Sequence, residues 1–277
     1  MADVGPRGLP ENYMTVDRSQ QRTASPPSKL LALTELPRAI SELGMLFAGA
    51  GPLLYTAPRG DGHPVLVLPG FMTGDGTTRI LRLFLRQLGY DVLGWELGWN
   101  AGPRTTGDDC EKLLSRLEAI HNATGEKVSL VGWSLGGIMA RRAANRAPDM
   151  VRQVITLGSP FAGAPRANNL VWLYEAVTGQ RIDGPENEKQ LRESLPAPSV
   201  PTTAIYSRGD GVVAWQNCYE PACSRTENIE VYGSHCGLGA NPWVLYAVAD
   251  RLSQDQEDWQ PFAWDSGSKD KRSCLPS

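Results

Sequence analysis

The sequence lacks a long hydrophobic run and an excess of positive charge. No stretch of the 277 residues approaches the ~20 consecutive apolar residues that a membrane-spanning helix needs. Residues 1–8 contain no apolar run behind a basic start, so we expect no signal peptide and a cytoplasmic location. The formal net charge of −3 gives no reason to expect a nucleic-acid partner.

Cysteine and histidine are also scarce. The five cysteines are an odd number, and free thiols are the expectation for a chain without an export signal. Cys218 and Cys223 enclose a short turn-like segment, and the sequence does not show whether they form a disulfide. The three histidines, His63, His121 and His235, leave few candidates for a general base at neutral pH.

Short apolar runs alternate with helical patterns along most of the chain. We expect strands at residues 65–68, 92–95, 128–131, 151–157, 202–206 and 229–232. Helices are expected between them, at residues 79–88, 106–122 and 135–146, with a closing helix at 242–253. This order predicts an α/β fold, with a mostly parallel sheet and helices on both faces.

The pattern divides the chain into three parts. Residues 1–28 are polar and aperiodic, and we expect them to form a mobile arm. Residues 29–253 are expected to form the α/β domain, and residues 254–277 a polar tail. From about residue 160 to about residue 200 the alternation breaks into two short helical segments, which predicts a small helical cap above the sheet's C-terminal edge.

A further helix is predicted ahead of the first strand. Leu36, Ile40, Leu43 and Phe47 recur at helical spacing, and we expect this apolar face to pack against the domain. The alternative is a helix that lies on a membrane surface. The segment is short and has little basic charge, so membrane contact is not indicated.

The strongest motif is Gly132-Trp133-Ser134-Leu135-Gly136, which lies between a predicted strand and a predicted helix. Glycine has no Cβ, so the chain can turn tightly and hold Ser134 in a strained conformation with an exposed hydroxyl. The helix that starts at the serine favours an anion at that point. We therefore interpret Ser134 as a nucleophile.

A serine nucleophile needs a base to remove its proton. His235 follows a predicted strand at the sheet edge where Ser134 is expected, and ligands gather at that edge of a parallel sheet. Asp210 also follows a predicted strand, and we expect it to orient the histidine. The chain order Ser134, Asp210, His235 is a known order for a catalytic triad. Glu96, after an earlier strand, is the rival for the acid.

The remaining candidates surround this triad. We expect the backbone N–H groups of Phe71, after the first strand, and Leu135, after the nucleophile, to bind an oxyanion. The cap is expected to present apolar side chains to an acyl group. The candidate substrate-binding residues are Met72, Trp133, Trp172, Leu173, Tyr174 and Val177.

Together these motifs resemble the α/β-hydrolase superfamily, and within it the small bacterial lipases and carboxylesterases, over about residues 64–252. The resemblance depends on four motifs in order: Pro69-Gly70-Phe71, Gly132–Gly136, Tyr206-Ser207-Arg208-Gly209-Asp210 and Gly233-Ser234-His235-Cys236-Gly237-Leu238. The sequence differs from the common lipase pattern at Pro69 and Trp133, where such lipases often have histidine, and neither position supplies a catalytic atom.

The resemblance implies hydrolysis of a small or medium acyl ester through an acyl-enzyme, with no cofactor and no metal. Two alternatives stay open: an acyltransferase on the same triad, and a catalytically silent binding protein with this fold. The sequence does not give the natural substrate, the acyl-chain length or the oligomeric state.

Overall fold

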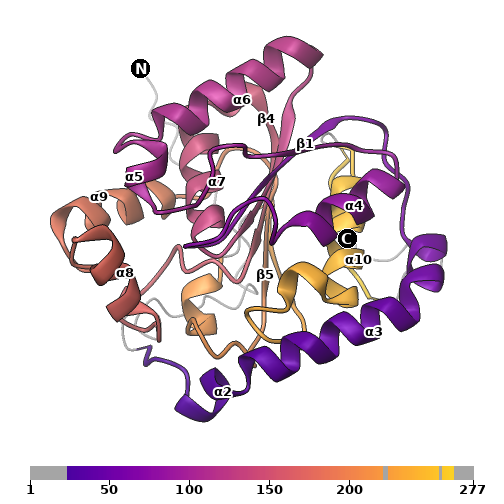
Figure 1. Cartoon of the computed structure of the whole chain (residues 1–277). Helices are drawn as coiled ribbons and strands as arrows, with labels where there is room; N and C mark the ends of the chain where they lie inside the picture. The colour runs from indigo at the N-terminus through magenta and orange to yellow at the C-terminus, as the bar shows by residue number, and fades with distance from the viewer. Residues whose placement is uncertain (1–23, 221–223, 256–257, 265–277) are drawn as a thin grey trace, which may run out of the picture.

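The computed structural model describes residues 24–220, 224–255 and 258–264 (Figure 1). These residues contain a six-stranded sheet with the strand order β2-β1-β3-β4-β5-β6, in which every neighbouring pair is parallel. The strands are β1 (Pro64–Leu68), β2 (Asp91–Gly94), β3 (Val128–Trp133), β4 (Val151–Leu157), β5 (Thr202–Tyr206) and β6 (Thr226–Glu230). The predicted α/β class with a parallel sheet is confirmed.

Helices cover both faces of the sheet. One face packs against α3 (Glu35–Thr56), α4 (Arg79–Gln87) and α10 (Pro242–Leu252). The other packs against α6 (Glu111–Thr124) and α7 (Leu135–Arg146). The remaining helices are α2 (Lys29–Leu33), α5 (Pro103–Thr106), α8 (Val171–Thr178) and α9 (Pro185–Ser194), with 3-10 turns at Pro148–Met150, Trp215–Cys218 and Leu238–Ala240. Of these, α8 and α9 lie between β4 and β5, in the segment for which a cap is predicted.

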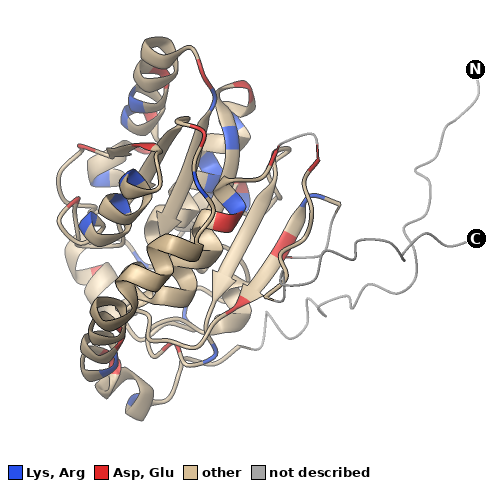
Figure 2. Ribbon diagram, turned by 90° about the vertical axis from the view of Figure 1, so that its right-hand side faces the viewer, with Lys and Arg blue, Asp and Glu red and all other residues tan. Residues whose placement is uncertain are grey.

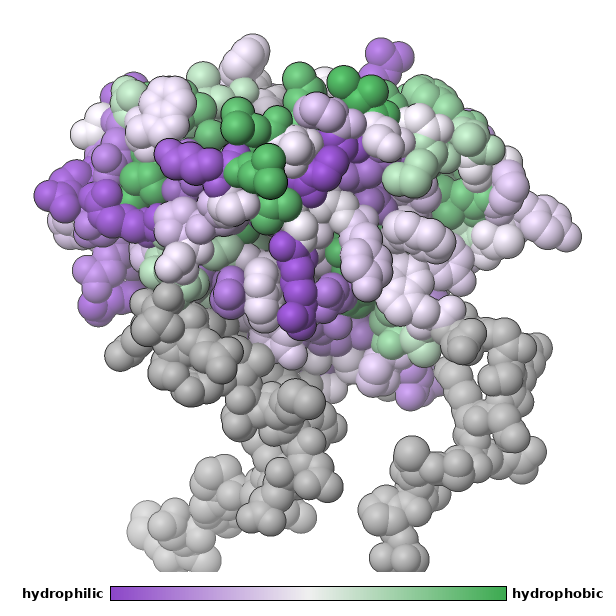
Figure 3. All heavy atoms as spheres, turned by 90° about the horizontal axis from the view of Figure 1, so that it is seen from below, coloured by the Kyte–Doolittle hydropathy of each residue, from purple (hydrophilic) through white to green (hydrophobic). Residues whose placement is uncertain are grey.

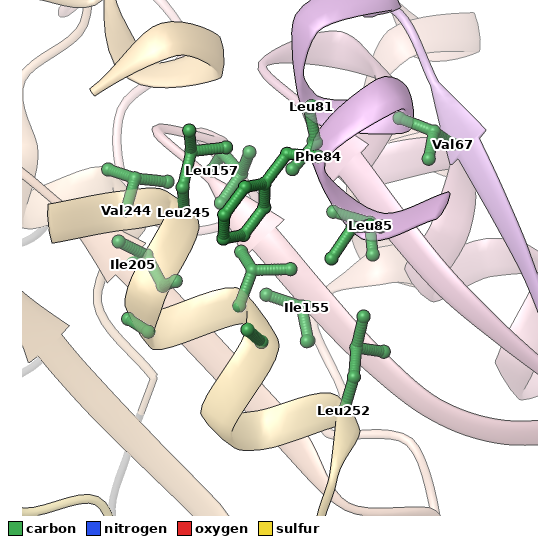
Figure 4. Packing of buried hydrophobic residues seen from close by; sticks show 14 of the residues in the cluster. Val67, Leu81, Phe84, Leu85, Ile155, Leu157, Ile205, Val244, Leu245 and Leu252 are labelled. Carbon is green, nitrogen blue, oxygen red and sulfur yellow. The ribbon is translucent and has the colours of Figure 1, made fainter. Parts of the chain in front are cut away.

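The core lies between the sheet and these helices. Strands β1 and β5 are buried along their whole length, as expected for parallel strands covered on both faces. Figure 4 shows Phe84 of α4 packed beside Leu157 of β4 and the α10 residues Val244 and Leu245. This packing fixes the strand ends from which the candidate site residues emerge.

Two element boundaries differ clearly from the sequence prediction. Strand β6 begins and ends earlier than the predicted strand at 229–232, so Tyr232 lies beyond it with an exposed side chain. The helix predicted at 106–122 is divided into α5 and α6. Cys218 is buried with a free thiol, whereas Cys223 lies outside the described residues.

Helix α3 does not turn the predicted apolar face toward the domain. Leu36, Ile40 and Phe47 are 67%, 62% and 74% exposed, whereas the buried residues are Glu35, Glu42 and Leu46. The expectation that the apolar face packs against the domain is therefore wrong. The face toward the domain meets backbone N–H groups of two loops, and carboxylates satisfy those donors.

The outer face of α3 carries no charge. After Glu42 the helix has no charged residue, and its ribbon has neither blue nor red in Figure 2 from there to its end. Figure 3 looks onto the underside of the molecule, where α2 and α3 lie, and hydrophobic residues are exposed on this face. Within the described ranges, no helix combines the length and the apolar content needed to cross a membrane.

Candidate active site

Ser134 lies in a tight turn between β3 and α7. Its backbone has φ 54° and ψ −121°, a strained conformation for a residue with a side chain, which costs about 1–3 kcal/mol. A Cβ atom on Gly132 would lie 2.4 Å from the Cα of Gly137, and one on Gly136 would lie 2.5 Å from the carbonyl oxygen of Leu68. Only glycine fits at these two positions, so the motif glycines let β3, α7 and β1 approach closely enough to hold the serine.

Asp210 and His235 form a buried pair beyond the ends of β5 and β6. The Oδ2 atom of Asp210 is 2.5 Å from Nδ1 of His235. The other oxygen, Oδ1, accepts the backbone N–H groups of Val212 at 2.8 Å and Val213 at 2.7 Å. One oxygen of Asp210 thus accepts hydrogen bonds from its own turn, and the second contacts the histidine. This contact fixes the ring orientation and leaves Nε2 as the nitrogen that can take a proton.

The end of β4 connects the serine to this pair. The backbone N–H of Ser134 donates to the carbonyl oxygen of Leu157 at 2.8 Å. At the next residue, a Cβ on Gly158 would lie 3.1 Å from Nδ1 of His235 and 3.3 Å from Oδ2 of Asp210. The Ser134 hydroxyl has no hydrogen-bond partner among the residues that the structure describes. Catalytic hydrogen bonds often form only when substrate is bound, so this geometry is compatible with a triad.

The surroundings of His235 favour its protonated form. Burial alone lowers the pKa of the imidazole, but the negative charges of Asp210 and Glu35 raise it, and the net shift is upward from the ordinary value. The neighbouring Cys236 thiol has its pKa raised to about 12, by burial and then by Glu35. Since that thiol stays protonated at neutral pH, it is a poor nucleophile.

A buried asparagine holds the loop after β1. The Nδ2 atom of Asn100 donates to the carbonyl oxygen of Pro69 at 2.8 Å. The backbone of Asn100 accepts the N–H of Met72 and donates to the carbonyl oxygen of Thr73, both at 2.8 Å. Sequence reasoning missed Asn100, because a single asparagine in a loop carries no signal of a contact about thirty residues away.

This arrangement leaves two backbone donors beside the serine. The N–H of Met72 is used by Asn100, whereas those of Phe71 and Leu135 have no acceptor within the described part of the chain. Phe71, Ser134 and Leu135 all line one cavity. The two free N–H groups therefore have the chemistry expected of oxyanion donors.

The cavity beside Ser134 has a volume of about 100 Å³. No charged side chain appears among its described lining residues, and its polar groups are the serine hydroxyl, the Tyr174 hydroxyl and three side-chain amides. It is lined by Phe71, Ser134, Leu135, Ile138, Pro160, Pro165, Asn168, Leu170, Tyr174, Ile182, Asn187, Gln190, Leu191 and Val212. An uncharged, mostly apolar cavity favours a hydrocarbon group over an ionic one.

Of the six candidate substrate-binding residues, Tyr174 lines this cavity. The other five, Met72, Trp133, Trp172, Leu173 and Val177, are not among its described lining residues. Trp172 is 67% exposed, because two residues on a helix are about 200° apart and Tyr174 occupies the inward side of α8. The Trp133 indole instead supports the histidine loop, donating to the carbonyl oxygen of His235 at 3.2 Å.

The rival acid lies elsewhere. Glu96 is exposed and forms an ion pair with Arg116 at 3.0 Å. It follows β2, which is separated from β5 by three strands of the sheet. Glu96 therefore has no contact with His235 in this structure.

A second Ser-His-Asp arrangement lies at the opposite edge of the sheet. His63 has Nδ1 2.5 Å from Oδ1 of Asp61 and Nε2 2.8 Å from Oγ of Ser129. Ser129 is fully buried within β3, and burial lowers the pKa of His63. A substrate cannot reach this serine, so the arrangement is structural. The third histidine, His121, lies in the last turn of α6 with Nδ1 2.8 Å from the carbonyl oxygen of Glu126, in agreement with the predicted helix end.

Known proteins match parts of this chain in sequence. A family model described as a PGAP1-like alpha/beta domain matches residues 108–202. A triacylglycerol lipase from Pseudarthrobacter phenanthrenivorans is 40% identical over 68 residues, which cover 24% of this chain and 20% of the lipase. A pimeloyl-[acyl-carrier protein] methyl ester esterase from Aliivibrio salmonicida is 32% identical over 108 residues, which cover 38% of this chain and 40% of the esterase. The chain thus spans well under half the length of these relatives.

A solved structure supports the fold over a larger part of the chain. Aspergillus fumigatus lipase B superposes with a TM-score of 0.56 and 22% identity, over 74% of this chain and 54% of the lipase. At that identity the likeness concerns the fold. The parallel sheet, the strand-turn-helix at Ser134 and this superposition together show that the chain has the fold of the α/β hydrolases.

Proposed function

We propose that this protein is a serine hydrolase that cleaves carboxylic esters through an acyl-enzyme. One observation carries the proposal: the strained Ser134 and two free backbone N–H groups line a cavity, at the sheet edge where Asp210 and His235 form a buried pair. Strain, free donors and a buried acid–base pair are each costly to a fold. Their coincidence at one strand edge favours catalysis over packing.

Each group has a defined part in the proposed reaction. The Oγ of Ser134 attacks the ester carbonyl carbon while Nε2 of His235 takes the hydroxyl proton. The N–H groups of Phe71 and Leu135 bind the oxyanion that forms on the carbonyl oxygen. The alcohol leaves with the proton from His235, and a water molecule then repeats the sequence to release the acid. Asp210 keeps the imidazole in the required tautomer and stabilises its cation.

The cavity indicates the class of ester. Its lining is uncharged, so an apolar acyl chain is preferred to a charged one. Each methylene buried there contributes up to about 0.8 kcal/mol. The names of two relatives, a triacylglycerol lipase and a methyl ester esterase, describe ester-cleaving enzymes and support the same reaction for this chain.

Labelling with a fluorophosphonate, followed by peptide mapping, tests the nucleophile. We expect the label on Ser134 in the wild type and none in Ser134→Ala. Hydrolysis of p-nitrophenyl esters of increasing chain length tests the activity, and Ser134→Ala should lower kcat by ~10⁴–10⁶ with an unchanged melting temperature. A variant that kept more than a tenth of wild-type turnover would contradict the assignment.

A further inference from the structure

One buried carboxylate joins the two loops that carry the acid and the base. Glu35, the first residue of α3, points into the domain. Its Oε1 accepts the backbone N–H of Gly211 at 2.7 Å and that of His235 at 3.1 Å. Its Oε2 accepts the N–H of Cys236 at 2.8 Å. The carboxylate therefore contacts the residue after Asp210 and His235 itself.

The neighbouring turns of α3 strengthen this connection. Arg38 pairs with Oε1 of Glu35 at 2.9 Å and donates to the carbonyl oxygen of Gly209 at 2.6 Å. Glu42, also buried, accepts the N–H of Ser234 at 2.6 Å and the side-chain amide of Asn241 at 3.1 Å. The inward face of the helix thus holds residues on both sides of each catalytic side chain.

Besides the contact between Asp210 and His235, the two loops are also linked through Ser207. The hydroxyl of Ser207 donates to the carbonyl oxygen of Gly233 at 2.7 Å and accepts the N–H of Gly233 at 3.2 Å. This link does not involve Glu35. Loss of the Glu35 contacts would therefore loosen the acid–base pair without separating the loops.

We propose that Glu35 is a positioning residue for the Asp210–His235 pair, whose carboxylate fixes the spacing of the two loops and places a second negative charge beside the histidine. The inference rests on the proposed function, because it concerns the same histidine acting as a base. An isolated charge so deeply buried is unfavourable, but three N–H groups and one guanidinium satisfy this one.

The charges around His235 determine the direction of the pH effect. The groups that face it are Asp210 from the β5 loop, Glu35 from α3 and the protonated Cys236 thiol beside it; Arg38 is paired with Glu35. Asp210 and Glu35 both raise the pKa of the imidazole against the lowering by burial. Removing the Glu35 charge lowers that pKa, so the base stays deprotonated to a lower pH.

The test measures the rate constant of fluorophosphonate labelling from pH 5 to pH 9. Glu35→Gln keeps the size of the side chain but loses the charge and replaces one acceptor with a donor. We expect labelling to slow by about 10- to 100-fold. The acid limb of the pH profile, where the rate constant falls as His235 takes up a proton, should move to lower pH. Glu35→Asp retains the charge at the wrong distance, so we expect slower labelling with the limb near its wild-type position.

Glu227→Gln is the matched control. Its carboxylate is mostly buried at the far end of the sheet, accepts the N–H of Phe262 at 2.7 Å and pairs with Arg251 at 2.9 Å. This control should lower thermal stability while leaving the acid limb in place. A Glu35→Gln variant with the wild-type labelling rate and limb, or with a stability loss alone, would overturn the inference. If Glu35→Gln does not fold, Glu35→Asp decides, and a wild-type labelling rate in that variant would refute the positioning role.

Failure of the proposed function gives a different result. In that case the wild-type protein itself takes no label at Ser134, and both ideas are wrong. Labelling of the wild type at Ser134 that does not change in the Glu35 variants keeps the proposed function and removes only the inference about Glu35.

Discussion

Replacing Gly158 by alanine tests whether the end of β4, which contacts both Ser134 and the Asp210–His235 pair, must leave space for that pair. The added Cβ would lie 2.8 Å from Cδ1 of Leu238, 3.1 Å from Nδ1 of His235 and 3.3 Å from Oδ2 of Asp210. The leucine methyl is the end of a flexible side chain and can move aside. The pair is less free, because two backbone N–H groups hold Oδ1 of Asp210 and the Glu35 carboxylate accepts the backbone N–H of His235.

Two separate costs add up at this position. Gly158 has φ 53°, and the left-handed region costs a residue with a Cβ about 1–2 kcal/mol. Overpacking adds about 1–3 kcal/mol. Each kcal/mol lowers the melting temperature of a domain of this size by about 2–4 °C. Displacement of the imidazole should also lower kcat/KM by up to about 100-fold.

Gly125→Ala is the matched control for backbone strain. Gly125 has φ 71° at the end of α6, and a Cβ there would meet no atom within 4 Å. This variant should lose stability because alanine is strained in the left-handed region, and it should keep full activity. Both variants are assayed with a p-nitrophenyl ester well below their melting temperatures. Equal activity in the two variants would refute the argument that Gly158 gives space to the catalytic pair.

Three further predictions concern the same site. Asp210→Asn should keep the fold and lower turnover by about 10³–10⁴, because the amide favours the wrong tautomer; if Glu96→Gln were instead the inactive variant, the acid would come from the earlier strand. The pKa of His235 is raised, and the base works only when deprotonated, so kcat/KM should fall as the pH drops through a value above the ordinary 6.5 of histidine; an acid limb below that value would contradict the assignment. Tyr174→Ala should change the preference for acyl-chain length, whereas Trp172→Ala, at an exposed position, should not; identical profiles for the two variants would exclude Tyr174 from the acyl site.

The fold class and the serine turn were predictable because their signals are local. Continuous apolar runs indicate strands buried on both faces. Two glycines around a serine, between a predicted strand and a predicted helix, indicate a tight turn in which backbone segments pack too closely for a Cβ atom. The order of strands also placed Asp210 and His235 beyond strands on one edge, and the structure brings their side chains into contact. Strand β6 was predicted too late in the chain, because its half-buried sequence is polar and the apolar residues Val231 and Tyr232 follow it.

Contacts between distant segments were not predictable in the same way. Periodicity shows which residues of α3 share a face but not which face turns inward, and the inward face is the one with Glu35 and Glu42. The glutamates are buried because loops some 170–200 residues later present backbone donors to them. Asn100 and Gly158 are likewise defined by neighbours that are far away in sequence.

The Ser129–His63–Asp61 arrangement has a consequence for automated annotation. A three-residue template that scores only atom distances would accept Ser129, His63 and Asp61, since His63 contacts the serine at 2.8 Å and gives as short a contact to its carboxylate as His235 does. A chemical probe would not reach Ser129, because its side chain has no exposed surface. Searches for unrecognised hydrolases therefore need a solvent-access criterion and a count of unpaired backbone donors next to each serine.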